Sequence, residues 1–154
     1  MNYRELEMKE IPLLKNCVEG LAVHHNRVSV NHGGRFPRRP AEKTLELFRQ
    51  GMEQGRSRIL GCFEGGRIVG FCKIDVEPPH GKLDYLFLEE EWRGKGLGGT
   101  LMDWAMDTFR ANGARRLEVK VIDGNPAIHL YEKYGFRLSS HILWNLEGEE
   151  EENA

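Results

Sequence analysis

Residues 83–136 constrain the fold more than any other part of the chain, because strand-like and helix-like patterns alternate there in a fixed order. An apolar strand-like run leads through a glycine-rich loop into an amphipathic helix, and a second strand-like run leads into a second helix. In chain order these segments are 83–88, 93–99, 100–112, 116–121 and 127–135. The order strand, loop, helix, strand, helix builds a crossover connection, so this stretch predicts an α/β fold.

The loop between the first strand and the first helix of this stretch has the composition of an anion-binding site. It reads Arg93-Gly94-Lys95-Gly96-Leu97-Gly98-Gly99 and runs into a helix. Glycines leave backbone N–H groups bare, and a helix N-terminus directs further N–H groups toward a negative charge. Arg93 and Lys95 can neutralise charge beside them. The sequence therefore predicts that this loop binds a phosphate.

The chain before residue 83 is predicted to form two helices and a hairpin. A weak strand pattern at 2–9 precedes apolar residues at helical spacing over 11–24. A loop without periodicity covers 24–40, and a second helix runs from Ala41 to the glycines at 51 or 55. Loops of this length are often functional, so we expect residues 24–40 to border a site.

The hairpin is marked by a pair of glycines between two strand-like runs. Residues 58–64 and 67–74 flank Gly65-Gly66, which is the composition of a tight two-residue turn. After Gly135, apolar residues up to 146 allow one or two final strands. No internal repeat or boundary interrupts residues 1–146, which predicts a single domain. We expect the acidic segment 147–154 to be a disordered tail.

Charge and cysteine content exclude several functional classes. The formal net charge of the 154 residues is -2, so no global basic field indicates binding to nucleic acid. Three cysteines without C-x-x-C spacing, at 17, 62 and 72, disfavour both a disulfide framework and a zinc site. No signal peptide and no apolar run of about 18 residues is present. We expect a cytoplasmic protein without a membrane or nucleic-acid partner.

Two general phosphate-binding motifs fit the glycine loop poorly. Gly94, Gly96 and Gly99 match the spacing of a dinucleotide fingerprint, and Asp123 follows the next strand, where a ribose-binding acid could lie. The fingerprint, however, places its first glycine directly after the strand, whereas five residues, 89–93, intervene here. A Walker-type loop is excluded, because no Gly-Lys-Ser/Thr follows. A dinucleotide-binding oxidoreductase therefore stays a distant alternative.

Three motifs in order resemble the GCN5-related N-acetyltransferase (GNAT) superfamily. The loop Arg93-Gly94-Lys95-Gly96-Leu97-Gly98 is similar to the family's Arg/Gln-x-x-Gly-x-Gly/Ala loop. The strand at 83–88 before it and the segment 125–136 after it resemble the other two motifs. The resemblance implies a mixed, mostly antiparallel sheet with helices on both faces and a splayed central strand pair, here 83–88 and 116–121.

The same resemblance implies acetyl-CoA (coenzyme A) as cosubstrate and a set of residues that bind it. In the family the glycine loop holds the pyrophosphate, and the pantetheine arm pairs with the backbone of the preceding strand. By this resemblance the cofactor-binding residues are Leu86, Phe87, Leu88, Arg93, Gly94, Lys95, Gly96, Leu97, Gly98, Gly99, Asn125 and Tyr131. Asn125 also precedes Pro126 as a helix N-cap, so it has a structural reading of equal weight.

Acetyl transfer to an amine needs an acid for the leaving thiolate and a base for the ammonium proton. Tyr131 matches the family tyrosine that lies beside the coenzyme sulfur, although its spacing from Ala127 and Ile128 also fits a packed core aromatic. Asp84 and Glu118 each lie within an otherwise apolar strand, where burial could raise the carboxyl pKa. In relatives that acetylate protein N-termini, a glutamate matching Glu118 is the base. Both carboxylates, and a water relay, remain candidates.

The sequence thus predicts an N-acetyltransferase that moves an acetyl group directly from acetyl-CoA to a primary amine. A non-catalytic acyl-CoA-binding or sensing module of the same fold is the alternative. The acceptor could be a peptide or a small molecule, and in the family the N-terminal helices and their loop line its pocket. A homodimer is common among relatives. His24, His25 and His32 lack a further acid or cysteine, so we expect no metal site.

Overall fold

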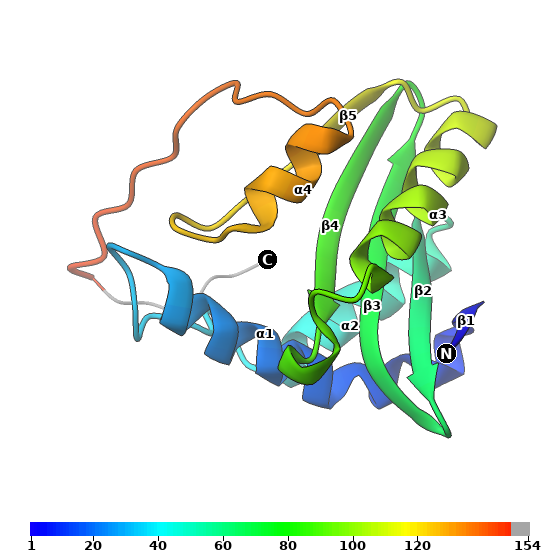
Figure 1. The fold of residues 1–154 in the computed structure, drawn as a ribbon, viewed down its shortest axis with the longest axis horizontal. Coiled ribbons are helices and arrows are strands. Elements are labelled where there is room, and N and C mark those ends of the chain that lie inside the picture. The colour runs from blue at the N-terminus through cyan, green and yellow to red at the C-terminus, as the bar shows by residue number, and fades with distance from the viewer. Residues whose placement is uncertain (149–154) are drawn as a thin grey trace.

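The computed structural model describes residues 1–148, which form a five-stranded sheet with helices on both faces (Figure 1). The strand order is β1-β2-β3-β4-β5, and every neighbouring pair is antiparallel except the parallel pair β4 and β5. The elements are β1 (Asn2–Glu5), the 3-10 helix η1 (Met8–Leu14), α1 (Lys15–Val28), α2 (Ala41–Glu53), β2 (Ser57–Glu64), β3 (Arg67–Glu77), β4 (His80–Leu88), the 3-10 helix η2 (Glu90–Trp92), α3 (Leu97–Ala111), β5 (Arg116–Val119) and α4 (Ala127–Lys133).

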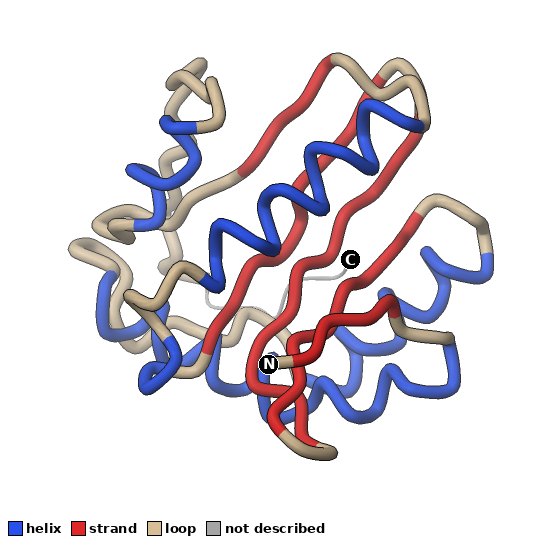
Figure 2. Tube along the Cα trace, turned by 45° about the vertical axis from the view of Figure 1, so that its right-hand side comes forward, coloured by secondary structure: helices blue, strands red, loops and turns tan. Residues whose placement is uncertain are grey.

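Two hydrophobic cores lie on the two faces of the sheet (Figures 1 and 2). Apolar residues of β2, β3 and β4 that point one way pack against η1, α1 and α2, with Phe48 and Phe71 at the centre. Those that point the other way pack against α3 and α4, around Ile74, Leu83 and Leu101. The predicted fold class is confirmed, since the period-two pattern of the strands feeds both layers.

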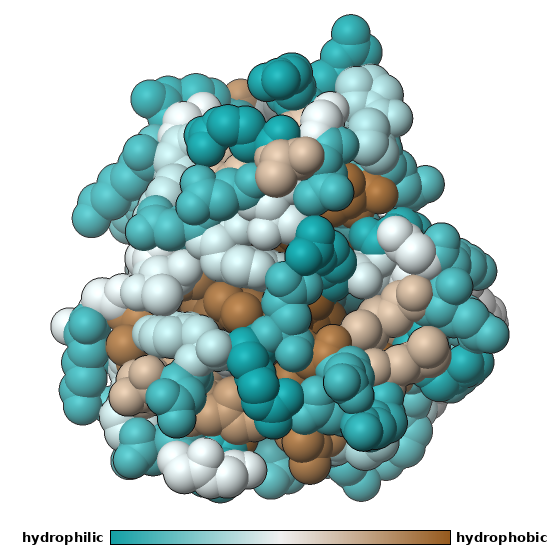
Figure 3. Space-filling model, turned by 90° about the vertical axis from the view of Figure 1, so that its right-hand side faces the viewer, coloured by the Kyte–Doolittle hydropathy of each residue, from teal (hydrophilic) through white to brown (hydrophobic). Residues whose placement is uncertain are grey.

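The surface seen from the right-hand side of Figure 1 is mostly hydrophilic, and hydrophobic residues appear only in the gaps between polar ones (Figure 3). Among the helices that the structure describes, none is long and apolar enough to cross a bilayer.

The predicted hairpin is confirmed as β2 and β3. Several helix and strand ends differ from the prediction, among them those of α1, α3 and β4. α1 continues to Val28, so His24 and His25 are helical and the loop is shorter than 24–40. Residues 24–27 are polar, so the helical spacing of apolar residues cannot be recognised there. No glycine or proline ends the helix at this point. α3 begins at Leu97 instead of Thr100. Its first turn was not predicted because it contains Gly98 and Gly99, and glycine has a low helix propensity. β4 begins at His80 and not at Leu83.

The predicted splay lies between β4 and β5 and follows from the unequal pairing of β4. The prediction that this pair is central is wrong for the described residues, because β5 is the edge strand of the sheet. On one side β4 pairs with β3 along its whole length, from His80 to Leu88. On the other side it pairs with β5 only from His80 to Leu83, opposite Arg116 to Val119. The register with β3 shifts between Lys73 and Ile74, which makes Asp84 the extra residue of a β-bulge. Beyond Leu83 the two parallel strands diverge.

The final strands expected after Gly135 are a wrong prediction within the described chain. Residues 137–148 adopt no strand there, and Leu138, Ile142 and Leu143 are 69%, 65% and 89% exposed. Alternating apolar residues indicate a strand only where a neighbouring strand accepts them, and this segment runs clear of its own sheet (Figure 1). The predicted tail at 147–154 falls largely on residues 149–154, which lie outside the described residues.

Candidate active site

The glycine loop forms an open cradle at the start of α3. Gly94 and Gly96 have φ of 75° and 82°, a left-handed conformation that other L-residues adopt at a cost of about 1–2 kcal/mol. Gly96 is the N-cap of α3 and makes no side-chain capping bond. The first N–H groups of a helix have no partner within the helix. Apart from the adjacent residues of the chain, no atom of the described residues lies within 4 Å of a Cβ built on Gly94 or Gly96, so the loop borders open space.

Arg93 does not extend into this cradle. Its Nε donates to the carbonyl oxygen of Leu88 at 2.8 Å, and its Nη1 lies 3.3 Å from Nδ1 of His24. Its guanidinium also lies 5.5 Å from the ring centre of Phe87. Arg93 therefore ties the loop to the end of β4 and to α1. The second predicted cation, Lys95, is exposed beside the loop, with Nζ 5.1 Å from the ring centre of Trp92.

A cavity of about 290 Å³ opens where β4 and β5 diverge. One wall consists of β4 residues 82–86, and the opposite wall consists of residues 119–122 and Asn125. α1 and the segment 36–39 close the side of the α1 and α2 layer, while Tyr131 of α4 reaches in from the other layer. The splay thus produces a channel between the two faces of the sheet, next to the end of β4 that carries the glycine loop.

Tyr131 lies in this channel and is 6% exposed. Its ring meets Phe136 edge to face, with centroids 6.3 Å apart. Burial raises the pKa of the Tyr131 hydroxyl, and the nearby Cys72 raises it further. The hydroxyl is therefore protonated at neutral pH, and it can donate a hydrogen bond or a proton to a group in the channel.

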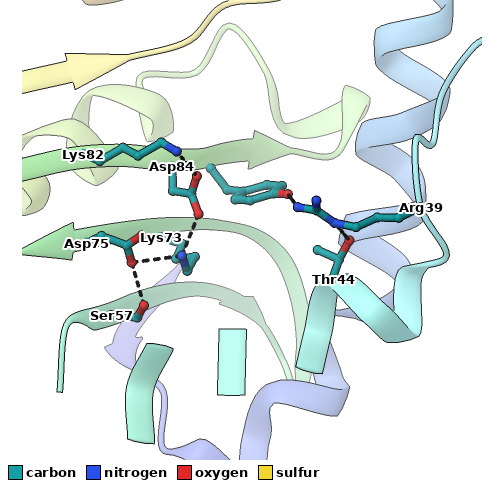
Figure 4. A network of polar contacts seen from close by, with 8 residues as sticks. Arg39, Thr44, Ser57, Lys73, Asp75, Lys82 and Asp84 are labelled. Carbon is teal, nitrogen blue, oxygen red and sulfur yellow. Dashed lines mark hydrogen bonds and ion pairs between the residues drawn. The ribbon is translucent and has the colours of Figure 1, made fainter. Parts of the chain in front are cut away.

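Asp84 lines the same cavity and is fixed by a network of lysines and acids (Figure 4). Its carboxylate accepts from Nζ of Lys73 at 2.6 Å and lies 3.4 Å from Nζ of Lys82. Lys73 is 4% exposed and also bonds Asp75 at 2.9 Å, which in turn accepts from the Ser57 hydroxyl. The two neighbouring ammonium groups fix the position of the Asp84 carboxylate on the bulge.

A second polar cluster lies farther along the same face. Nε of Arg39 donates to the Thr44 hydroxyl at 3.1 Å, and Nη2 of Arg39 lies 3.4 Å from the hydroxyl oxygen of Tyr85 (Figure 4). Burial raises the pKa of Tyr85, and the adjacent Asp84 charge adds to this. The guanidinium of Arg39 is thereby held at the wall of the cavity.

The loop between β5 and α4 is packed against the C-terminal end of α1. Asp123 accepts from the Ser29 hydroxyl at 2.7 Å and from the backbone N–H of Asn31 at 2.8 Å. These bonds lower the pKa of Asp123. A Cβ on Gly124 would lie 2.3 Å from the carbonyl oxygen of Val28, so only glycine permits this approach. The carboxylate that a dinucleotide site would use is therefore already engaged.

The remaining predicted residues are distributed over several environments. Glu118 is exposed and borders a separate groove with Lys82 and Arg116, outside the cavity that holds Tyr131, so the expected burial of this carboxylate is wrong. Asn125 lies one residue before the N-cap of α4, which is Pro126 and not Asn125 as predicted. Its Oδ1 still accepts from the N–H of Ala127 at 3.0 Å, and the residue lines the cavity. Leu86 lines the cavity as well.

Phe87 was predicted to bind the cofactor, but its side chain packs into the core between the sheet and the helices α1 and α2. Only the backbone of Phe87 therefore remains for a cofactor.

Three polar residues near the cavity, Lys73, Arg39 and Thr44, were not predicted as site residues. A lysine between Cys72 and Ile74 in an apolar strand was a usable signal, because such a charge is buried only with a partner.

The comparisons with known proteins agree with this geometry. A family model described as Acetyltransferase (GNAT) family matches residues 25–136. Mycothiol acetyltransferase of Corynebacterium glutamicum is 36% identical over 91 residues, which cover 57% of this chain and 31% of that protein. Spermine/spermidine N(1)-acetyltransferase of Bacillus subtilis is 25% identical over 96 residues, covering 56% and 63%. The chain thus matches only part of the length of these relatives.

A solved structure shows the same fold over almost the whole chain. The paiA N-acetyltransferase of Thermoplasma acidophilum, crystallised in complex with coenzyme A, superposes with a TM-score of 0.72 at 19% sequence identity. The match covers 92% of this chain and 94% of that one.

Proposed function

Because the chain belongs to the acetyltransferase (GNAT) family, we propose that it is an enzyme that transfers the acetyl group of acetyl-CoA to a primary amine. The observation that carries the proposal is the channel at the splay of β4 and β5. It brings Tyr131 and Asp84 into one cavity beside the end of β4 that leads to an open glycine cradle. A reaction between a bound thioester and an amine needs such a junction between a cofactor site and an acceptor site.

The residues present suit coenzyme A. The N–H groups of residues 96–99, at the start of α3, would hold the diphosphate, and Lys95 would add a cation. Among residues 1–148, no strand pairs with β4 beyond Leu83 on the β5 side, so the β4 backbone there could pair with the amide groups of a pantetheine arm. Bound there, acetyl-CoA would supply an activated acetyl group, and its sulfur would be a thiolate leaving group.

The proposed chemistry assigns one role each to Asp84 and Tyr131. Asp84, directly or through water, accepts a proton from the acceptor ammonium and leaves a neutral amine. The amine nitrogen forms a bond to the acetyl carbon, and the carbon–sulfur bond breaks. Tyr131 donates a proton to the departing sulfur. The nitrogen, which carries an extra proton after its attack, returns one to the Tyr131 oxygen directly or through water, so that a neutral amide forms and Tyr131 is restored. Glu118 is the alternative base, reached through water from outside the cavity.

The transfer is proposed to be direct, without a covalent intermediate on the protein. Cys17, Cys62 and Cys72 are all buried, and burial raises the thiol pKa of each. A buried, protonated thiol is a poor nucleophile. Three free thiols also suit a reducing compartment, so a cytoplasmic location is part of the proposal. A homodimer stays a prediction.

The test is release of free coenzyme A thiol when the protein is mixed with acetyl-CoA and a panel of amines. We expect release that depends on an amine and that falls strongly in Tyr131→Phe. Calorimetric titration with acetyl-CoA separates the rival function, because a sensing module would bind acetyl-CoA and release no thiol with any amine. Absence of both binding and release would exclude the proposed function.

A further inference from the structure

A chain of polar side chains crosses the mouth of the channel, starting at the end of β4. Arg93 donates through Nε to the carbonyl oxygen of Leu88, the last residue of β4, and its Nη1 lies 3.3 Å from Nδ1 of His24 on α1. The His24 ring also has a side-chain hydrogen bond with Asn125, which lines the opposite wall of the cavity. His24 therefore connects the two sides of the opening, the end of β4 and the loop before α4.

The contact with Arg93 defines the protonation state that His24 needs. A guanidinium only donates hydrogen bonds, so Nδ1 of His24 accepts one only when that nitrogen carries no proton. The proton of the neutral ring then lies on Nε2, which leaves this N–H for the bond with Asn125. Oδ1 of Asn125 accepts from the N–H of Ala127 at 3.0 Å and has a second lone pair. The bridge is therefore complete only with a neutral imidazole.

The surroundings of His24 favour this neutral state. Burial lowers the pKa of the His24 imidazole, and the charge of Arg93 lowers it further. The hydrogen bond with Asn125 acts in the opposite direction and raises the pKa, but the pKa stays below the ordinary value of 6.5. His24 is therefore uncharged at pH 7.

The other charged or titratable groups that face His24, among the described residues, oppose one another or are neutral. Arg27 of α1 lowers the His24 pKa and Glu90 of η2 raises it, and these two side chains pair with each other at 3.3 Å. The ring centre of His25 lies 6.4 Å from that of His24, and burial lowers the His25 pKa to about 4, so this ring is uncharged at pH 7. Arg93 is therefore the charge that an imidazolium at His24 would meet first.

Protonation of His24 would break the bridge. An imidazolium donates at both nitrogens, so it offers Arg93 no acceptor and places a second cation beside the guanidinium. Arg93 also ties the glycine loop to the carbonyl oxygen of Leu88, so a displaced guanidinium disturbs both the cradle and the end of β4. These are the two surfaces that the proposed function assigns to coenzyme A.

We propose that the neutral imidazole of His24 is a positioning group that holds the channel mouth at the width a pantetheine arm requires, and that acid releases it. This inference rests on the proposed acetyltransferase function and adds a control by pH to its coenzyme site. His24 does not line the cavity, so it acts through Arg93 and Asn125. Since the folded-state pKa lies below 6.5, affinity for acetyl-CoA is retained at pH 7 and falls as the pH drops below 6.5.

The test is calorimetric titration with acetyl-CoA between about pH 7.5 and about pH 5. His24→Asn is the conservative variant, because its amide oxygen takes the place of Nδ1, accepts from Arg93 and does not titrate. His24→Leu removes the acceptor at every pH. The phosphates of the coenzyme titrate in the same range, so each variant is compared with the unmodified protein at the same pH.

The expected results separate the acceptor from the titration. At about pH 7.5, His24→Asn should bind acetyl-CoA within about threefold of the unmodified protein, and His24→Leu should bind about five- to thirtyfold more weakly, as for one hydrogen bond to a charged group. At about pH 5, the unmodified protein should lose about twofold or more in affinity relative to His24→Asn. His129→Asn, at an exposed site on α4, is the matched control and should follow the unmodified protein throughout.

Three results would overturn the inference and leave the enzyme assignment standing. They are unchanged affinity in His24→Leu with native unfolding in urea, an equal response to pH in the unmodified protein and His24→Asn, and tighter binding by the unmodified protein at low pH. The last would mean that the imidazolium attracts the diphosphate.

Two further measurements keep the inference separate from folding defects and from the function. Nitrogen NMR of the unmodified protein at neutral pH should show a proton on Nε2 of His24 alone, and a proton on Nδ1 would contradict the bridge. The expected pH pattern without thiol release for any amine would overturn the enzyme assignment and support the role of His24. No binding of acetyl-CoA by the unmodified protein at any pH would overturn both.

Discussion

The two sides of β4 show how one strand can serve stability and function at once. Toward β3 it is paired from end to end, and the residues behind that seam, such as Phe71 and Ile74, are fully buried. Toward β5 it is paired only as far as Leu83, opposite Val119. Val119 at the end of this pairing and Leu86 beyond it are half-buried at a cavity. Packing on the side of β4 that faces β3, the closed side, stabilises the fold. The side that faces β5, the open side, is packed less, and it leaves backbone groups and space that a ligand can use.

The largest expected effect is on the closed side. Phe71→Ala removes a fully buried ring between β3 and the α1 and α2 layer, so it should lower the free energy of unfolding by about 3–5 kcal/mol. Val119→Ala, at the open side, should lower it by about 1 kcal/mol or less, because the side chain is already half-exposed. Urea unfolding measures both values. Equal losses for the two variants would contradict the division into a closed and an open side.

The next effect is on turnover at the open side. Tyr131→Phe removes the proposed proton donor and should lower kcat by about 10²–10³-fold, with a change in unfolding free energy below about 1 kcal/mol. Tyr134→Phe is the comparison variant at saturating acetyl-CoA. Its hydroxyl lies 2.7 Å from Asp103 and 3.1 Å from the carbonyl oxygen of Gly99, and the residue does not line the cavity. It should lower stability by about 1 kcal/mol and leave kcat nearly unchanged. The reverse pattern would place the functional hydroxyl on Tyr134.

A third comparison decides between the two candidate bases. Asp84→Asn removes a carboxylate inside the cavity and should lower kcat by about 10²-fold. Glu118→Gln changes an exposed carboxylate outside it and should have a much smaller effect. Thiol-release kinetics across pH measure both variants. A larger loss of kcat in Glu118→Gln than in Asp84→Asn would show that Glu118, acting through water, is the base.

The smallest effect concerns acid stability at the cavity wall. Burial lowers the pKa of His25 to about 4 in the folded chain, against an ordinary value of 6.5. Between these values the unfolded chain binds more protons, so stability falls as pH drops from about 6.5 to about 4, by about 1–3 kcal/mol in total. His25→Asn should remove that part of the pH dependence in urea unfolding. His129→Asn, at an exposed site, should not.

The sequence predicted those parts of the molecule that depend on local pattern or on a motif. The hairpin around Gly65-Gly66, the helix behind Pro126 and the glycine loop all follow from residues adjacent in the chain. Contacts between distant segments could not be predicted, such as that of Arg39 with Tyr85 or that of Lys73 with the bulged Asp84. They depend on register and on a one-residue bulge that no local pattern specifies.

The wrong prediction of final strands has the same origin. Leu138 and Ile142 have the spacing of a strand, but pairing needs a neighbour, and the sequence does not say whether one is within reach. The same limit explains why Asp84 and Glu118 were equal candidates. Each interrupts an apolar strand, and only the diverging geometry of β4 and β5 separates the cavity from the outer groove.

Calorimetric titration with acetyl-CoA tests the central claim most directly, namely that the open side of β4 and the cradle at the start of α3 form a coenzyme site. We expect saturable binding that weakens about 5–30-fold in Gly96→Ala, since φ at Gly96 is 82° and strain of about 1–2 kcal/mol would distort the cradle. Gly55→Ala imposes the same kind of strain at φ of 79° in the turn after α2 and should bind normally. No binding by the unmodified protein, or equal weakening in both variants, would contradict the account.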